Sequence, residues 1–156
     1  MRIGVISDTH GLLRPEALAA LSGAEAILHA GDIGDPAIGN PAILDVLAAI
    51  APVTAIRGNI DRKGPCSELP AIELVELGGK SIYMLHDRHE LDLDPTAAGI
   101  AAVISGHSHQ PLIEWKKDVL YFNPGSAGPR RFSLPISLGF LLIEDDRIEP
   151  QLVTLG

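Results

Sequence analysis

The 156-residue sequence has a single cysteine, Cys66, and few aromatic side chains. One cysteine cannot form a disulfide within the chain and is typical of a reducing compartment, so we predict a cytoplasmic protein. Aromatic residues make up 4% of the chain and hydrophobic residues 46%, so aliphatic side chains must fill the core. The length is typical of one domain, which we predict to span residues 1–156 without a linker or internal repeat.

Positive charge and long apolar runs are also scarce. The chain has 12 Lys and Arg residues against 20 Asp and Glu residues, which gives a formal net charge of −8. This balance disfavours a nucleic acid or an anionic membrane surface as the main partner. It still permits a small phosphate ester, because bound divalent ions can reverse the local field. We expect no membrane segment and no signal peptide, because no apolar run is long enough and polar residues 7–10 follow the first one.

The first half of the chain alternates between strand and helix patterns. Short apolar runs at 2–6, 26–29 and 53–56 predict strands, and the segments 15–21 and 41–50 predict helices that each begin at a proline. The order strand, helix, strand, helix, strand is typical of a parallel sheet with right-handed crossovers.

The second half of the chain is rich in hairpin patterns. Three pairs of runs flank short turns: 71–77 with 81–85, 112–115 with 119–122, and 138–144 with 148–154. Between them, 95–99 predicts a short helix, 101–104 a strand, and 60–70 a loop. A parallel start followed by hairpins favours two sheets packed face to face, with helices outside.

Side chains that can bind metal follow five of the apolar runs. These donors are Asp8, His10, Asp32, Asn59, His86, His107 and His109. The carboxyl ends of parallel strands share one edge of a sheet, where ligands bind, so five separate stretches can deliver donors to one place. The pattern predicts a protein that holds metal ions and uses them for hydrolysis.

Two pairs of these donors are spaced two residues apart. In an extended chain such residues face the same way, so each pair can coordinate one ion from one side. The pairs are Asp8 with His10 and His107 with His109. Asp32 has two carboxylate oxygens and can therefore bridge two ions.

The donors belong to motifs that follow one another along most of the chain. The motifs are Asp8-x-His10, Gly31-Asp32-x-x-Asp35, Gly58-Asn59-x-Asp61, His86 and Gly106-His107-x-His109. In this order they resemble the motifs of the calcineurin-like metallophosphoesterases. The short length, the Gly-Asn-x-Asp motif and Asn123-Pro124-Gly125-Ser126 are similar to the small bacterial and archaeal phosphodiesterase branch. Five motifs in order are far more specific than one.

The resemblance implies an α/β fold: a four-layer αββα sandwich with two mixed β-sheets packed face to face and flanking helices. It also implies two divalent ions. One would be held by Asp8, His10, Asp32 and His109. The other would be held by Asp32, Asn59, His86 and His107, with Asp32 as the bridging ligand. Mixed Asp, Asn and His donors suit Mn²⁺ first, with Ni²⁺, Fe²⁺ or Zn²⁺ as alternatives.

The implied activity is metal-dependent hydrolysis of a phosphate ester, with a small phosphodiester favoured over a monoester. Two ions about 3.5–4 Å apart lower the pKa of a shared water, and the bridging hydroxide attacks phosphorus in line with the leaving oxygen. On this interpretation Asp32, Asn59 and His107 are the catalytic candidates. No protein general acid is evident, because Ile60 stands where many larger relatives carry a histidine.

Several candidates have an ordinary structural alternative. Asp35, Arg57 and Asp61 are candidates for orienting a ligand or contacting the substrate. Asp61 could orient Asn59 or a ligand histidine, or be a solvated loop acid. Asp35 could simply be a turn residue, and Arg57 could pair with one of the many acids. His89 competes with His86 as a ligand, because the glycine that usually follows this metal-binding histidine is missing. We prefer His86, which lies at a strand end as the other donors do.

The competing function is that of a non-catalytic metal-binding scaffold of the same fold, acting through protein–protein contacts as the retromer subunit of this fold does. Such a conversion is expected to lose metal ligands, whereas every ligand position here is filled, which favours the enzyme. The pattern leaves open the natural substrate and a homo-oligomer formed through exposed strand edges.

Overall fold

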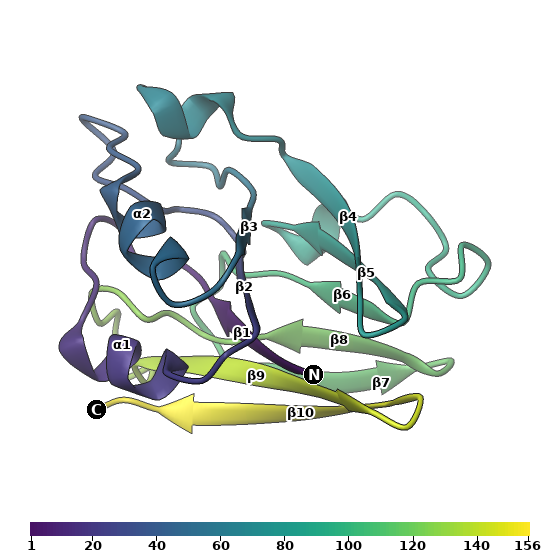
Figure 1. The fold of residues 1–156 in the computed structure, drawn as a ribbon. Coiled ribbons are helices and arrows are strands. Elements are labelled where there is room, and N and C mark those ends of the chain that lie inside the picture. The colour runs from purple at the N-terminus through teal and green to yellow at the C-terminus, as the bar shows by residue number, and fades with distance from the viewer.

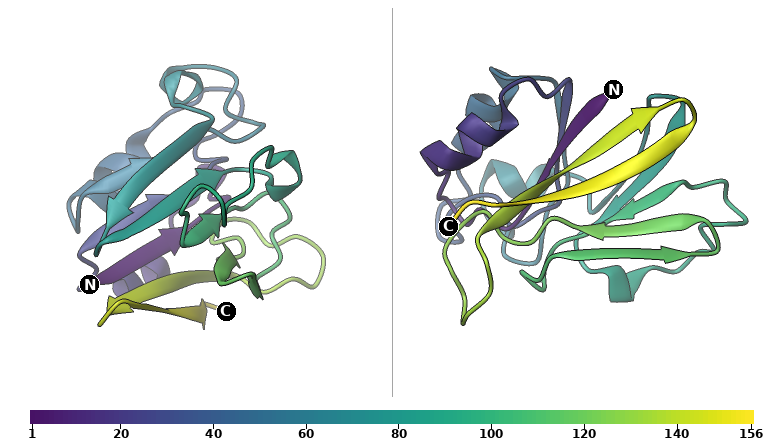
Figure 2. Two further views of the ribbon diagram at one scale, coloured as in Figure 1. Left: turned by 90° about the vertical axis from the view of Figure 1, so that its right-hand side faces the viewer. Right: turned by 90° about the horizontal axis from the view of Figure 1, so that it is seen from below.

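The computed structural model describes residues 1–156. The chain forms two five-stranded β-sheets that pack face to face (Figure 1). Sheet A has the strand order β10-β9-β1-β2-β3, and sheet B has the order β4-β5-β6-β8-β7. Figure 2 shows the sheets as separate layers, with both α-helices on the side of sheet A that faces away from sheet B. This arrangement confirms the α/β sandwich of two mixed sheets packed face to face, with the α-helices outside sheet A.

Sheet A contains the parallel unit expected from the first half of the chain. Its strands β1, β2 and β3 pair in parallel, and the C-terminal strands β9 and β10 add an antiparallel hairpin beside β1. The strands span β1 Arg2–Ile6, β2 Ala26–His29, β3 Val53–Ala55, β9 Ser137–Glu144 and β10 Arg147–Thr154. The carboxyl ends of β1, β2 and β3 therefore lie at one edge of the sheet.

Sheet B has a parallel centre and a hairpin at either edge. Strands β5, β6 and β8 pair in parallel, while β4 pairs antiparallel with β5 and β7 with β8. The strands span β4 Ile72–Leu77, β5 Lys80–Leu85, β6 Ala102–Ile104, β7 Leu112–Lys116 and β8 Val119–Asn123. The β4–β5 hairpin turns at Gly78 and Gly79, whose φ angles of 60° and 80° are those that a tight two-residue turn requires.

The main core lies between the two sheets and is aliphatic, as the low aromatic content requires. Val5 and Leu28 of sheet A face Met84 and Ile104 of sheet B, and all four side chains are fully buried. Phe122 is the only aromatic side chain in this core cluster.

Two α-helices of seven residues each cover the outer face of sheet A. Helix α1 spans Pro15–Leu21, and α2 spans Ala42–Ala48, slightly shorter than the helix expected over 41–50. Leu21 and Leu47 anchor them in a second apolar cluster beneath the helices. Neither helix is long and apolar enough to cross a membrane.

The outer face of sheet B is covered by the segment between β5 and β6, which contains the 3₁₀ helix η2 (Arg88–Glu90) but no α-helix. The prediction of a short helix over 95–99 is wrong, because these residues form turns. The Asp94 carboxylate accepts the backbone N–H of Thr96, and Gly99 adopts a φ of 73° that ends the turn. Five residues also yield too few hydrogen bonds to offset helix nucleation.

Candidate metal centre

The seven candidate ligands follow the carboxyl ends of β1, β2, β3, β5 and β6, as the sequence pattern predicts. Five of them have a left-handed backbone, with φ between 47° and 69°: Asp8, His10, Asp32, His107 and His109. Residues other than glycine rarely adopt this conformation, and it is concentrated at functional sites. The expected extended geometry of the two closely spaced pairs is therefore wrong, because sharp turns carry these donors.

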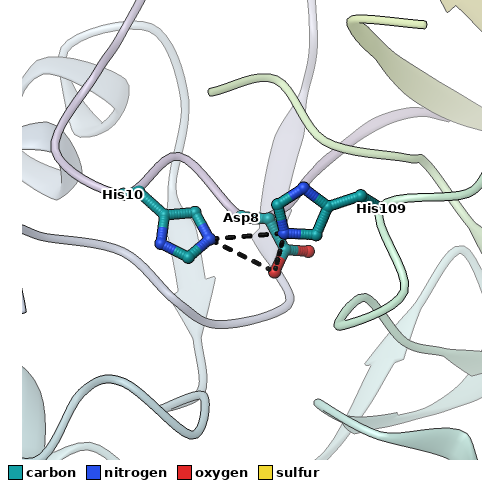
Figure 3. Close-up of side chains that lie close together, drawn as sticks. All are labelled: Asp8, His10 and His109. Atoms are coloured by element: carbon teal, nitrogen blue, oxygen red, sulfur yellow. Dashed lines mark hydrogen bonds and ion pairs between the residues drawn. The ribbon is translucent and has the colours of Figure 1, made fainter. Parts of the chain in front are cut away.

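The first group of converging donors joins the loop that follows β1 to the loop that follows β6 (Figure 3). Asp8 Oδ1 lies 3.4 Å from His109 Nε2 and 3.8 Å from His10 Nε2. The two imidazole nitrogens are 3.4 Å apart. Three donor atoms thus form a small triangle, with Asp8 and His109 buried and His10 half-buried. One cation could contact all three atoms at once.

The second group combines both aspartates with His86. His86 Nε2 lies 3.2 Å from Asp32 Oδ2 and 3.8 Å from Asp8 Oδ1. Asp32 Oδ2 is also 3.8 Å from His10 Nε2, a member of the first group. Asp8 Oδ1 therefore belongs to both groups, and Asp32, a member of the second group, lies beside the first. This geometry suits a shared carboxylate, but it gives Asp8 as good a bridging position as Asp32.

Each aspartate has one oxygen held by the protein and one oxygen facing the other donors. Asp8 Oδ2 accepts hydrogen bonds from the Ser7 hydroxyl at 2.7 Å and from the His107 backbone N–H at 3.1 Å. Asp32 Oδ1 accepts the Ile60 backbone N–H at 3.0 Å. Such contacts fix the orientation of a ligand carboxylate. The remaining oxygens, Asp8 Oδ1 and Asp32 Oδ2, point into the two groups.

His86 is arranged in the same way. Its Nδ1 donates to the Ala30 carbonyl at 2.7 Å, which leaves Nε2 facing the aspartates. Both His86 Nε2 and Asp8 Oδ1 are buried without a hydrogen-bond partner. A buried polar atom left unpaired costs about 1–3 kcal/mol, which makes such atoms rare without a reason. A divalent cation among these donors would supply the missing partner, so the residues fit a metal site.

His107 belongs to neither group but lies beside His86 of the second, and Asn59 contacts His107. His107 Nδ1 is 3.0 Å from Asn59 Oδ1, and the centroids of the His107 and His86 rings are 5.2 Å apart. Since an amide oxygen only accepts, His107 Nδ1–H donates to it, and Nε2 faces the Asp87 carboxylate at 3.9 Å. His109 therefore faces Asp8, whereas His107 faces Asn59 and His86.

Asp61 ties together the two loops that follow β2 and β3. Its carboxylate accepts the backbone N–H of Gly58 at 2.8 Å, of Asp32 at 2.9 Å and of Ile33 at 3.1 Å. Burial raises the pKa of Asp61, and these N–H groups partly oppose that shift. Asp61 thus positions Asp32 through its backbone, whereas the sequence suggested Asn59 or a histidine as its target.

His29 links the loops that follow β1 and β2. Its Nδ1 accepts the Gly31 backbone N–H at 3.1 Å, so Nε2 carries the proton and donates to Thr9 Oγ1 at 2.9 Å. Thr9 in turn donates to the Ile33 carbonyl at 2.7 Å. Burial is the main reason why the pKa of His29 falls to about 4, so this imidazole remains neutral. The contacts fix the loops that carry Asp8 and Asp32.

The other candidates lie further out. Asp35 is exposed, and its carboxylate accepts the Ala37 backbone N–H, which makes it a turn residue. Arg57 is also exposed and donates to the Leu69 carbonyl, just beyond the 3₁₀ helix η1 (Pro65–Glu68). His89 is a member of neither group.

The sequence interpretation missed Asp87. Its Oδ2 lies 3.9 Å from His107 Nε2, and its Oδ1 lies 3.1 Å from His89 Nδ1. Partial burial raises the pKa of Asp87, but the contacts with His89 outweigh it and hold the pKa below its usual range. The available signal was its place directly after His86, at a strand end like the other donors.

The buried charges of the second group affect one another strongly. Burial lowers the pKa of His86, but Asp32 and Asp8 outweigh this effect and raise it to about 9. Burial raises the pKa of Asp8, yet the surrounding histidines hold it well below its usual range. In the metal-free protein, the raised pKa of His86 adds stability that is fully present below pH 6.5 and is lost as the pH rises through about 9.

Metal uptake at neutral pH is expected to release the proton held by His86. Coordination needs a neutral imidazole, so apparent Mn²⁺ affinity should rise as the pH approaches 9. Titration calorimetry at pH 7.5 in buffers of different ionisation enthalpy should show release of about one proton or more. The exposed His89→Ala variant serves as the control and should release the same number. If the heat of Mn²⁺ binding did not depend on the buffer, no proton would be released on binding, and the prediction would be wrong.

Clustered Asp and His donors at the strand ends of two packed sheets define a candidate metal-binding α/β protein. Residues 1–146 match the family model of the calcineurin-like phosphoesterase superfamily domain. The chain therefore belongs to this superfamily, which confirms the resemblance of its motifs. Membership supports a phosphoric ester hydrolase that uses divalent metal ions.

Individual relatives agree with this assignment. The chain is 36% identical to the "Probable metallophosphoesterase" of Methanothermobacter thermautotrophicus, and the match covers 100% of this chain and 94% of the relative. A novel archaeal phosphodiesterase has the same fold, with a TM-score of 0.76 at 23% identity over 98% of this chain and 100% of its own. Zn²⁺-bound Vps29 from Entamoeba histolytica is similar in fold, with a TM-score of 0.70 at 21% identity over the full length of both chains.

Proposed function

We propose that the protein hydrolyses a small phosphodiester at a centre of two divalent ions. Mn²⁺ is the first candidate, ahead of Ni²⁺, Fe²⁺ and Zn²⁺. The observation that carries the proposal is the buried, unpartnered Asp8 Oδ1, which lies in both groups of converging donors. A lone surface cluster of acids would not bury such an atom.

In the proposed centre, Asp8, His10 and His109 hold one ion and Asp32 and His86 hold the other. The Asp32 carboxylate, whose Oδ2 also lies 3.8 Å from His10 Nε2, would serve both ions. Asn59 and His107 complete the second site after a small rearrangement of their mutual contact, which now joins the two side chains at 3.0 Å. Two ions so placed would lower the pKa of a shared water and offset the charge that develops on the phosphoryl group.

The surrounding residues place the phosphate and limit the leaving group. His107 and Asn59 stand at the exposed side of the donors, where a phosphate would arrive. Ile60 cannot give a proton to the departing oxygen, which favours esters with acidic leaving groups. The fold shared with an archaeal phosphodiesterase also favours a diester as the substrate class.

The alternative is a non-catalytic metal-binding scaffold, supported by the fold shared with Vps29. The two readings differ in turnover. A scaffold would bind metal at the same donors without hydrolysing an ester. An enzyme would both bind metal and hydrolyse the ester.

The test is an assay of the metal-stripped protein after Mn²⁺ is added back. Bis-p-nitrophenyl phosphate and p-nitrophenyl phosphate share a leaving group and differ in the second ester. We expect hydrolysis only with metal, faster on the diester. No turnover of either substrate with Mn²⁺, Ni²⁺, Fe²⁺ or Zn²⁺ would exclude the enzyme.

A further inference from the structure

The Asn123–Ser126 loop, which begins at the last residue of β8, contacts both turns that carry the first group of donors. One turn spans residues 106–109, and the other contains Asp8. No residue of the loop belongs to either group of donors itself. Asn123 and Ser126 are each only 3% exposed, so their polar side chains must find partners within the protein.

The two ends of the Asn123 side-chain amide have different roles. Its Oδ1 accepts the Gly125 backbone N–H at 2.9 Å, which closes a local turn of the kind that asparagine commonly forms. Its Nδ2 donates to the Gly106 carbonyl at 2.9 Å and to Ser108 Oγ at 3.2 Å. These partners fix the orientation of the amide, because an N–H needs an acceptor and a carbonyl needs a donor. Asn123 therefore holds the chain on both sides of His107.

The turn that Asn123 holds has an unfavourable backbone conformation. His107 and His109 have φ angles of 69° and 63°. Such angles persist in residues other than glycine only where the surrounding contacts enforce them. The Asn123 amide supplies contacts of this kind. Without it the turn could relax, and His109 Nε2 would leave its position 3.4 Å from Asp8 Oδ1.

Ser126 holds the other turn of the first group. Its Oγ donates to the Asp8 carbonyl at 3.0 Å and accepts the Gly128 backbone N–H at 3.3 Å. The next residue, Ala127, donates its backbone N–H to the Ser7 carbonyl at 3.1 Å. Asp8 also has a left-handed backbone, with a φ of 55°. The loop is thus attached to both turns from which the donors of the first group project.

Resting on the proposed function, we propose that Asn123 and Ser126 are positioning residues for the metal centre. Their hydrogen bonds go to the backbone and to Ser108, so they act through the two turns and not on a donor side chain directly. By tying the turns together they keep Asp8 Oδ1 and His109 Nε2 close enough to bind one ion. Contacts of this kind commonly contribute about 10–100-fold to metal affinity.

The test measures Mn²⁺ binding to the metal-stripped full-length protein by titration calorimetry. Asn123→Asp is the most specific variant, because it keeps the oxygen that accepts the Gly125 N–H and removes only the amide donor. We expect its Mn²⁺ affinity, and that of Ser126→Ala, to fall by about tenfold or more. A negative charge near the centre would by itself favour a cation, so the lost donor would account for the fall in Asn123→Asp.

Two control variants separate the positioning role from a loss of stability. Leu47→Ala removes a fully buried side chain from α2, and Asn40→Ala removes an amide that accepts the Ala42 backbone N–H at 3.0 Å. Leu47→Ala should lower the urea midpoint of the metal-free protein, but both controls should bind Mn²⁺ as tightly as wild type.

The outcomes distinguish the positioning role from the proposed function. If Asn123→Asp and Ser126→Ala bound Mn²⁺ as tightly as Leu47→Ala, the loop would only stabilise the fold, and the positioning role would be wrong. If wild type bound Mn²⁺ but hydrolysed no ester, the proposed function would fail, while weaker binding by the two variants would still support the positioning role.

Discussion

Replacing Asp32 with asparagine is expected to lower kcat for diester hydrolysis by about a thousandfold while the fold persists. Asp32 Oδ2 lies 3.2 Å from His86 and 3.8 Å from His10, so its charge serves both groups of donors. Loss of a residue that only orients a ligand costs about 10–100-fold, and loss of the ligand charge itself should cost more.

The fold should tolerate this change because of the backbone at position 32. Asp32 has a φ of 57°, and asparagine is among the few residues that accept this conformation readily. Its amide oxygen can still accept the Ile60 N–H. Activity is measured on the Mn²⁺-loaded protein, with circular dichroism as the check on folding. Asp45→Asn, an exposed change in α2, is the control. Full activity in Asp32→Asn would mean that its role is wrongly assigned.

Asp61→Ala is expected to lower the free energy of unfolding by about 2–4 kcal/mol. The carboxylate accepts three backbone N–H groups, from Gly58, Asp32 and Ile33, and is itself buried. Alanine would leave these donors without partners, at about 1–3 kcal/mol for each one that water cannot reach. The measurement is urea denaturation of the metal-free protein.

Two further variants sharpen this result. Asp61→Asn keeps one acceptor oxygen, so its loss of stability should be smaller than that of Asp61→Ala. Asp92→Ala, an exposed change with no hydrogen bond to lose, should stay within about 0.5 kcal/mol of wild type. A change for Asp61→Ala as small as that of Asp92→Ala would show that the carboxylate does not hold the two loops.

The placement of the candidate donors at one edge of the sheets could be predicted because it depends on local pattern. Each apolar run ends at a strand end, and the residues that follow, such as Asp8 and Asp32, must emerge at the shared edge of the sheets. The alternation of strands and hairpins likewise predicted the two-sheet architecture. These inferences need only the period of the hydrophobic residues and the position of polar residues after them.

The geometry inside the site could not be predicted in the same way. The left-handed turns at Asp8 and His109 depend on how loops from distant strands pack, so residue spacing alone gave the wrong extended conformation. The same holds for Asp61, whose three backbone contacts cross from one loop to another. The helix expected over 95–99 failed because Asp94 and Gly99 favour turns that local apolar spacing does not reveal.

The most direct measurement is anomalous scattering from crystals of the Mn²⁺-loaded protein. We expect two peaks about 3.5–4 Å apart. One should lie among Asp8, His10 and His109, and the other beside Asp32 and His86. A single peak, or none near Asp8 Oδ1, would contradict a centre of two ions.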